Sequence, residues 1–151
     1  MPNKIIIHHS LTTDSGTVSW GAIRKWHTGL TGSPIKGDPN YNPYIENPMN
    51  DIGYGFGIEL INDHYEILMG RRPDLTGAHT IGQNNQSIGI CVVGHYDIDP
   101  VADGIKDCLR NLLAWLIMNY KIPSKEIYGH CEFAYKTCPG KNLMDWIRKN
   151  R

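Results

Sequence analysis

Two distant segments of the chain carry side chains that zinc accepts as ligands. His130 and Cys138 lie eight residues apart near the C-terminus, and an apolar run near the N-terminus ends in the pair His8-His9. Imidazole nitrogens and a thiolate are common zinc ligands, and a set of three leaves one coordination position open for water. These residues therefore indicate a catalytic zinc site rather than a structural one.

The spacing by itself leaves two alternatives open. Single histidines and cysteines in loops usually have no special role, so His130 and Cys138 could be ordinary loop residues. Neighbouring residues of a strand point to opposite faces, so only one of His8 and His9 can face a common site. The pattern does not say which of the two it is.

The segments around these residues predict the elements that must position them. Residues 5–8 predict a strand buried on both faces, followed by a polar loop at 10–16. Residues 126–129 predict a short strand that delivers His130, and Ser19 can cap a helix that runs to His27. The other predicted elements are an irregular loop at 29–50, a β-hairpin of 55–61 and 65–69, a strand at 87–93 and a final helix at 143–147.

The longest predicted helix covers residues 105–120. Its apolar residues recur at i, i+3, i+4 and i+7, and Pro123 follows its end. Strands and helices alternate loosely along the chain, which indicates an α/β fold with a central mixed β-sheet flanked by α-helices. A chain of 151 residues without an internal repeat is typical of one domain, here residues 1–151.

The composition argues against several classes of function. Fifteen basic and fifteen acidic residues cancel, so no excess charge attracts nucleic acid. The sequence has no stretch for membrane insertion, and its N-terminal apolar run is too short for a secretory signal. We therefore expect a cytoplasmic location in the producing cell, with no disulfides among the four cysteines and with Cys91 and Cys108 as small buried residues.

Seven short segments together resemble one known family. In order and spacing, they are similar to the zinc-dependent N-acetylmuramoyl-L-alanine amidases, which include phage lysozyme-amidases and the animal peptidoglycan recognition proteins. The resemblance runs from Ile5 to about Ile147 and is highly specific. The segments are Ile-Ile-His-His-Ser at 6–10, Ile-Arg-Lys-Trp-His at 23–27, Asp-Ile-Gly-Tyr-Gly-Phe at 51–56, Gly-Arg at 70–71, Gly-Ala-His-Thr at 77–80, Asn-Gln-Ser-Ile-Gly-Ile-Cys at 85–91, and the Gly-His and Lys-Thr-Cys-Pro-Gly parts of 129–140.

The resemblance implies a role for particular residues. It assigns His8, His130 and Cys138 as ligands of the zinc ion. His9 is then expected either to pack in the interior or to contact a ligand without binding the zinc itself. Tyr54 matches an active-site tyrosine and Lys136 a catalytic lysine of the phage-type enzymes, and recognition proteins often lack that lysine. His79 falls where the family often has a histidine near the substrate.

Three departures from the family pattern bear on the site. Cys91 stands where some bacterial relatives carry a catalytic glutamate, which moves the proton transfer toward Tyr54 and Lys136. Those relatives also tend to use an aspartate where this chain has Cys138. The loop at 29–50 looks longer than its counterpart in compact phage enzymes, which changes the expected shape of the substrate groove.

The implied reaction is hydrolysis of the amide bond between N-acetylmuramic acid and L-alanine in bacterial peptidoglycan, by a phage or prophage endolysin. One alternative is a module of the same fold that binds peptidoglycan without cleaving it, and another is a cytosolic enzyme that recycles muropeptides. A third is regulation through protein contact, since some compact phage relatives also bind a polymerase. The sequence shows no feature specific to a protein partner.

Overall fold

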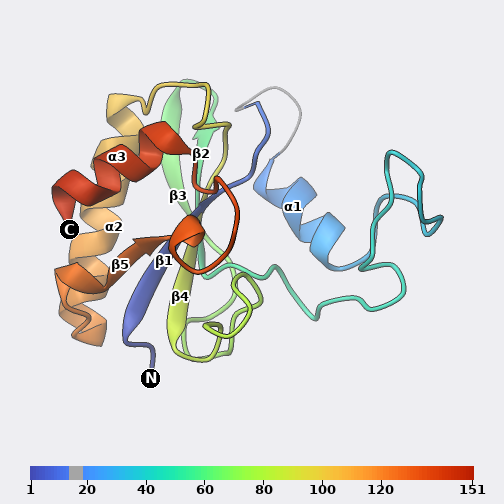
Figure 1. Cartoon of the computed structure of the whole chain (residues 1–151), viewed down its shortest axis with the longest axis horizontal. Helices are drawn as coiled ribbons and strands as arrows, with labels where there is room; N and C mark the ends of the chain where they lie inside the picture. The colour runs from blue at the N-terminus through green and yellow to red at the C-terminus, as the bar shows by residue number, and fades with distance from the viewer. Residues whose placement is uncertain (14–18) are drawn as a thin grey trace.

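Five strands form one mixed β-sheet in the computed structural model, which describes residues 1–13 and 19–151 (Figure 1). The strands lie in the order β3-β2-β4-β1-β5, and only the β2–β3 pair is antiparallel. Strand β1 lies inside the parallel part of the sheet, between β4 on one side and β5 on the other. The strand bounds are β1 Lys4–His9, β2 Phe56–Ile61, β3 His64–Met69, β4 Ser87–Val92 and β5 Ile127–Gly129.

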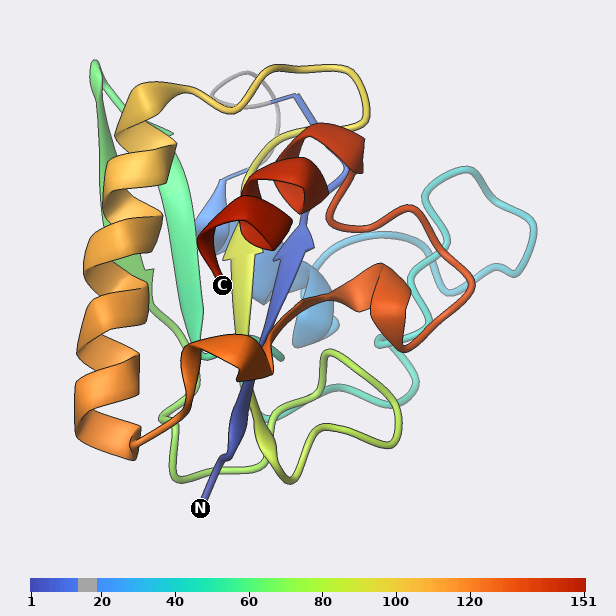
Figure 2. The ribbon, with the colours of Figure 1, turned by 60° about the vertical axis from the view of Figure 1, so that its left-hand side comes forward.

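Helices cover both faces of this sheet. The helices α2 (Asp103–Tyr120) and α3 (Lys141–Asn150) lie on one face, and α1 (Trp20–His27) lies on the other (Figures 1 and 2). Two 3₁₀ turns, Ser124–Glu126 and His130–Glu132, flank β5. The predicted α/β fold of a single domain is therefore confirmed. Among the described residues, no helix has both the length and the apolar character needed to cross a membrane.

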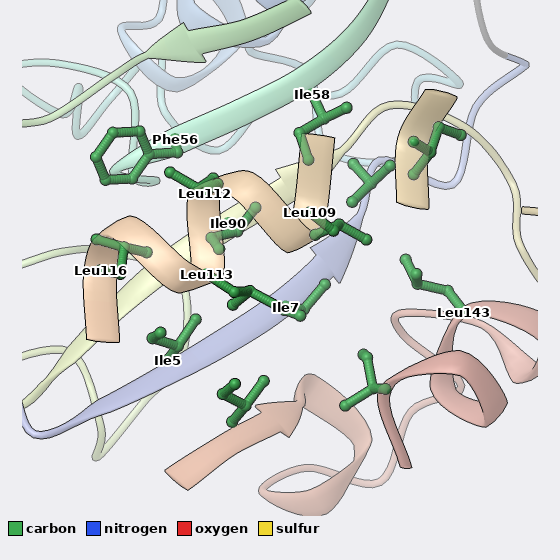
Figure 3. Packing of buried hydrophobic residues seen from close by; sticks show 14 of the residues in the cluster. Ile5, Ile7, Phe56, Ile58, Ile90, Leu109, Leu112, Leu113, Leu116 and Leu143 are labelled. Atoms are coloured by element: carbon green, nitrogen blue, oxygen red, sulfur yellow. The ribbon is translucent and has the colours of Figure 1, made fainter. Parts of the chain in front are cut away.

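The main hydrophobic core lies between the sheet and the helices α2 and α3. Ile5 and Ile7 of β1 face it, together with alternate residues of β2 and β4, and they meet one apolar side of α2 (Figure 3). Alternation along a strand then turns the intervening side chains, Ile6 and His8, toward the face that carries α1. The core residues labelled in Figure 3 are Ile5, Ile7, Phe56, Ile58, Ile90, Leu109, Leu112, Leu113, Leu116 and Leu143.

Most predicted elements are confirmed, with small shifts at their ends. The side chain of Ser19 accepts a hydrogen bond from the amide of Ala22 and caps α1 as expected. The hairpin turn is shorter than expected because Asn62 adopts a left-handed φ of 58°, so that His64 already belongs to β3. Of the loop predicted at 10–16, residues 14–16 lie outside the described part of the chain.

The helix α1 rests on the sheet through Trp20. The indole lies over Gly57 of β2, where an added Cβ would come within 2.6 Å of the ring. The Trp20 amide donates to the buried carboxylate of Glu59 (3.0 Å), and its indole N–H donates to the carbonyl of Met69 (3.3 Å). Beyond α1 the chain has no helix or strand until Phe56, so the irregular loop predicted at 29–50 is confirmed.

We predict that Gly57→Ala destabilises the protein by about 1–3 kcal/mol, because the new methyl group overpacks the ring of Trp20. Urea unfolding followed by tryptophan fluorescence measures this difference. The control is Gly21→Ala in exposed α1, where the added Cβ finds its nearest neighbour 3.7 Å away and helix propensity favours alanine by up to about 1 kcal/mol. Equal stability of the Gly57→Ala and wild-type proteins would refute the packing role of Gly57.

Candidate functional site

The three predicted ligands meet at the carboxyl ends of β1 and β5. One potential ligand atom from each of His8, His130 and Cys138 lies within 4.8 Å of the others. The Sγ atom of Cys138 is 3.8 Å from Nδ1 of His8, and the rings of His8 and His130 have centroids 4.4 Å apart. Of the two N-terminal histidines, His8 is the one that lies beside His130 and Cys138.

The parallel pairing of β1 with β5 brings two of these residues together. Ile7 is in register with Gly129, so the next residue of each chain segment, His8 and His130, emerges at the same place. Cys138 returns to this point through a loop whose ends are joined by a hydrogen bond from the Cys131 amide to the Cys138 carbonyl (2.6 Å). This loop brings Cys138 back beside His130.

This donor set fits a divalent metal ion. In a tetrahedral site with metal–nitrogen bonds of about 2.0 Å and metal–sulfur bonds of about 2.3 Å, nitrogen and sulfur ligands lie about 3.5 Å apart. The Nδ1–Sγ distance of 3.8 Å is close to that value. The other nitrogen of His8, Nε2, lies 3.0 Å from Nδ1 of His79 and 3.3 Å from Oγ1 of Thr80. His8 can therefore offer Nδ1 to a metal while Nε2–H is held from behind.

The surroundings keep both imidazoles neutral. Burial, followed by the neighbouring histidines, lowers the pKa of His8 well below its ordinary value, and burial followed by Lys136 lowers the pKa of His130. Neutral imidazole is the form that binds metal. Burial raises the pKa of the Cys138 thiol to about 12, although the amide of His9 donates to its Sγ (3.4 Å) and acts in the opposite direction. Metal binding must therefore displace the thiol proton.

Tyr54 lies beside this cluster, in the segment between α1 and β2. Its ring centroid is 5.1 Å from that of His8. Burial, followed by the nearby Cys91 and Cys138, raises the pKa of Tyr54 well above its ordinary value. The hydroxyl consequently keeps its proton across the physiological range and can act as a hydrogen-bond donor.

Lys136 also lies at the hollow that holds this cluster. Its side chain is exposed, and it lines the same hollow as the three potential ligands. It is also close enough to lower the pKa values of His8 and His130. Tyr54 and Lys136 thus both border the hollow that holds the cluster. The hollow has a volume of about 590 Å³ and is lined by His8, His9, Leu11, His27, Tyr44, Tyr54, Ala78, His79, His130, Lys136, Thr137 and Cys138.

Two further residues at this site were not singled out from the sequence. Thr80 contacts both His8 and His79 through its hydroxyl. His27 borders the hollow, and its Nδ1 accepts a hydrogen bond from the amide of Gly53 (3.0 Å), next to Tyr54. Both lie within segments that resemble the family, the only sequence signal that could have found them.

A model of the N-acetylmuramoyl-L-alanine amidase family matches residues 1–141. The chain belongs to this family. The endolysin of Escherichia phage T7 is 30% identical to it over 98% of this chain and 87% of that protein. The endolysin of Klebsiella phage KP32 is 29% identical over the same shares.

Solved structures of this amidase family also share the fold. A Drosophila PGRP-LB variant in complex with tracheal cytotoxin has a TM-score of 0.73 and 25% identity, over 97% of this chain and 79% of that one. The Clostridium intestinale amidase LysCS gives the same TM-score with 23% identity, over 98% of this chain and 82% of that one, which shows likeness of fold.

We predict that the metal-free amidase-family chain loses stability as the pH falls from about 6.5 to about 4. Burial, followed by Arg71, lowers the pKa of His27 from 6.5 to about 4. The unfolded chain therefore takes up a proton first, so the stability from a neutral His27 is complete above about pH 6.5 and is lost on acidification. His27→Gln should flatten this pH dependence in urea titrations.

The matched control is His64→Gln. His64 is exposed, and hydrogen bonds to Asp63 and Glu66 raise its pKa, which is the opposite sign. Its removal should leave the acid-induced loss at least as steep as in the wild type. A His27→Gln protein with the wild-type pH dependence would show that His27 does not cause the loss.

Proposed function

We propose that this chain is a zinc-dependent N-acetylmuramoyl-L-alanine amidase of the phage endolysin type, with residues 1–151 as one catalytic domain. The observation that carries the proposal is the meeting of His8, His130 and Cys138 in a hollow that Tyr54 and Lys136 also border. Two imidazoles and one thiol are typical ligands of zinc, and three protein ligands leave room for water. This combination is suited to amide hydrolysis.

Zinc held by this set would act as a Lewis acid and lower the pKa of a bound water to about 7. The protein contributes the orientation of the ligands. The hydrogen bonds of His8 with His79 and Thr80 fix the imidazole so that Nδ1 faces Cys138. The amide of His9 donates to the sulfur and stabilises the thiolate once the proton has left.

Lys136 and Tyr54 act on the scissile amide. The ammonium group of Lys136 stabilises the negative charge that develops on the carbonyl oxygen. The Tyr54 hydroxyl, which retains its proton, donates a hydrogen bond that orients the attacking water or passes a proton through it. His79 both holds His8 from behind and lines the hollow, so it is placed to contact the substrate.

The proposed substrate is bacterial peptidoglycan. The phage endolysins that resemble this chain align with nearly the whole of it. A fold relative, Drosophila PGRP-LB, forms a complex with tracheal cytotoxin, a monomeric diaminopimelic acid-type peptidoglycan. In this proposal the enzyme is made in the cytoplasm of the infected cell and acts on the wall after release. Nucleic acid and membrane insertion have no part in it.

Retention of all three potential zinc ligands favours catalysis over binding alone. A module that only recognises peptidoglycan needs neither a thiol at position 138 nor a lysine directed at the same hollow. A muropeptide-recycling enzyme would use the same residues and differ only in the size of its substrate. The choice of substrate in the following experiment separates these cases.

Zinc-loaded protein should release stem peptides with free L-alanine N-termini from purified sacculi, without new reducing sugar ends. Mass spectrometry of the soluble products distinguishes this cleavage from glycosidase activity. Cys138→Ser, which removes a ligand, should lose the zinc held beside His8 and His130 and should lose cleavage. Cleavage of soluble muropeptides but not sacculi would point to recycling. Binding to sacculi with no cleavage of either substrate by zinc-loaded protein would refute the amidase proposal.

We further predict that Tyr54→Phe and Lys136→Ala each lower turnover by about a hundredfold or more. Each variant should still hold one zinc ion per chain at His8, His130 and Cys138. Each change removes a group that acts in the transition state and leaves the ligands intact. Tyr128→Phe and Lys125→Ala, which lie outside the hollow, are the matched controls. Wild-type turnover in either test variant would show that the residue has no part in the mechanism. Loss of zinc would show instead that the residue holds the zinc ligands in place.

A further inference from the structure

A second cluster of metal-binding side chains lies on the other side of β1. One ligand atom from each of His9, His95 and Asp97 lies within 4.8 Å of the others. His9 follows His8 in the strand and therefore points to the opposite face, toward Tyr96 and the helices α2 and α3. The amidase mechanism uses none of these three side chains.

A tight turn after β4 presents two members of this cluster. The carbonyl of His95 accepts hydrogen bonds from the amides of Ile98 (3.0 Å) and Asp99 (2.9 Å), which holds His95 and Asp97 on one short loop. The amide of Tyr96 donates to Nδ1 of His9 (3.2 Å), so the loop is also fixed to β1. The rings of His9 and His95 have centroids 5.7 Å apart.

One atom of this cluster is left without a partner. Nδ1 of His95 is buried and has no hydrogen-bond partner among the described residues. A buried polar atom in that condition is destabilising, and native proteins usually avoid it. A metal ion would satisfy a neutral imidazole nitrogen as a hydrogen-bond donor does. The unpaired nitrogen is thus a second, independent sign of a ligand at this place.

Asp97 can join a metal without breaking its present contacts. One carboxylate oxygen accepts from the Thr137 hydroxyl (2.8 Å) and the other from the Lys141 amide (3.1 Å). Each oxygen keeps a further lone pair, because a carboxylate has about four acceptor sites. Nitrogen and oxygen ligands lie about 3–4 Å apart around a metal with bonds of about 2.0–2.2 Å, so small side-chain rotations would close the set.

We propose that His9, His95 and Asp97 form a second site for a divalent transition metal of the zinc class, with imidazole and carboxylate ligands and no sulfur. The site joins the end of β1 to the turn after β4. Through the Asp97–Thr137 hydrogen bond it also holds the loop that carries Cys138. It therefore acts as a structural clamp behind the first cluster, and it stands independently of the proposed amidase activity.

Cobalt(II) titration of the metal-free chain of residues 1–151 tests the site. Cobalt bound to a thiolate shows an intense near-ultraviolet charge-transfer band, and cobalt bound only to nitrogen and oxygen does not. Metal retained after gel filtration is measured by mass spectrometry. The wild type should retain two equivalents, only one of which produces the band. Cys138→Ser should retain one equivalent without the band, and His95→Ala should retain one with the band at full intensity.

His64→Ala is the matched control, since it removes an exposed histidine outside the cluster and should still retain two equivalents. Asp97→Asn, which preserves the side-chain shape, is a second test variant with the same expected result as His95→Ala. If circular dichroism shows that one of the two does not fold, the other is used. If neither variant folds, Cys138→Ser still tests the second site, because it should retain one equivalent of cobalt without the charge-transfer band. One equivalent in the wild type, two in a folded His95→Ala or Asp97→Asn protein, or none in Cys138→Ser would overturn the second site. Absence of amidase activity would leave this result unaffected.

Discussion

The parallel pairing of β1 with both β4 and β5 is the constraint on which the rest of the structure depends. Ile5 and Ile7 must face the core under α2 and α3, and this fixes His8 on the opposite face and His9 on the same side as the core. A slip of one residue would exchange the two histidines and move Ile5 and Ile7 out of this core to the face that carries α1. The hydrophobic core therefore determines the chemistry at the end of the strand.

Burial at this edge of the sheet then sets the chemical state of the cluster. Low solvent access keeps the imidazoles of His8 and His130 neutral and Tyr54 protonated, which are the forms needed for metal binding and for hydrogen-bond donation. The same burial disfavours the thiolate of Cys138 in the metal-free chain. A bound cation would compensate for this cost, so the cluster is better suited to hold a metal than to remain empty.

The fold and the position of the cluster could be predicted because their signals are local. Apolar runs and helical periodicity mark the strands and α2, and a histidine at a strand end needs only the strand to place it. The choice between His8 and His9 required the family resemblance at first, and the register with β5 then answered it. The hydrogen bond between His8 and His79 joins distant segments, as does the cluster of His9 with His95 and Asp97. Neither leaves a spacing pattern in the sequence.

X-ray absorption at the zinc edge tests the central claim most directly, that the first site binds zinc through His8, His130 and Cys138. The sample is the His95→Ala protein loaded with one equivalent of zinc, so that the second cluster does not contribute. The account predicts one sulfur at about 2.3 Å and two imidazole nitrogens at about 2.0–2.1 Å, with one further light-atom ligand. A spectrum without sulfur, or one with more than one sulfur, would contradict it.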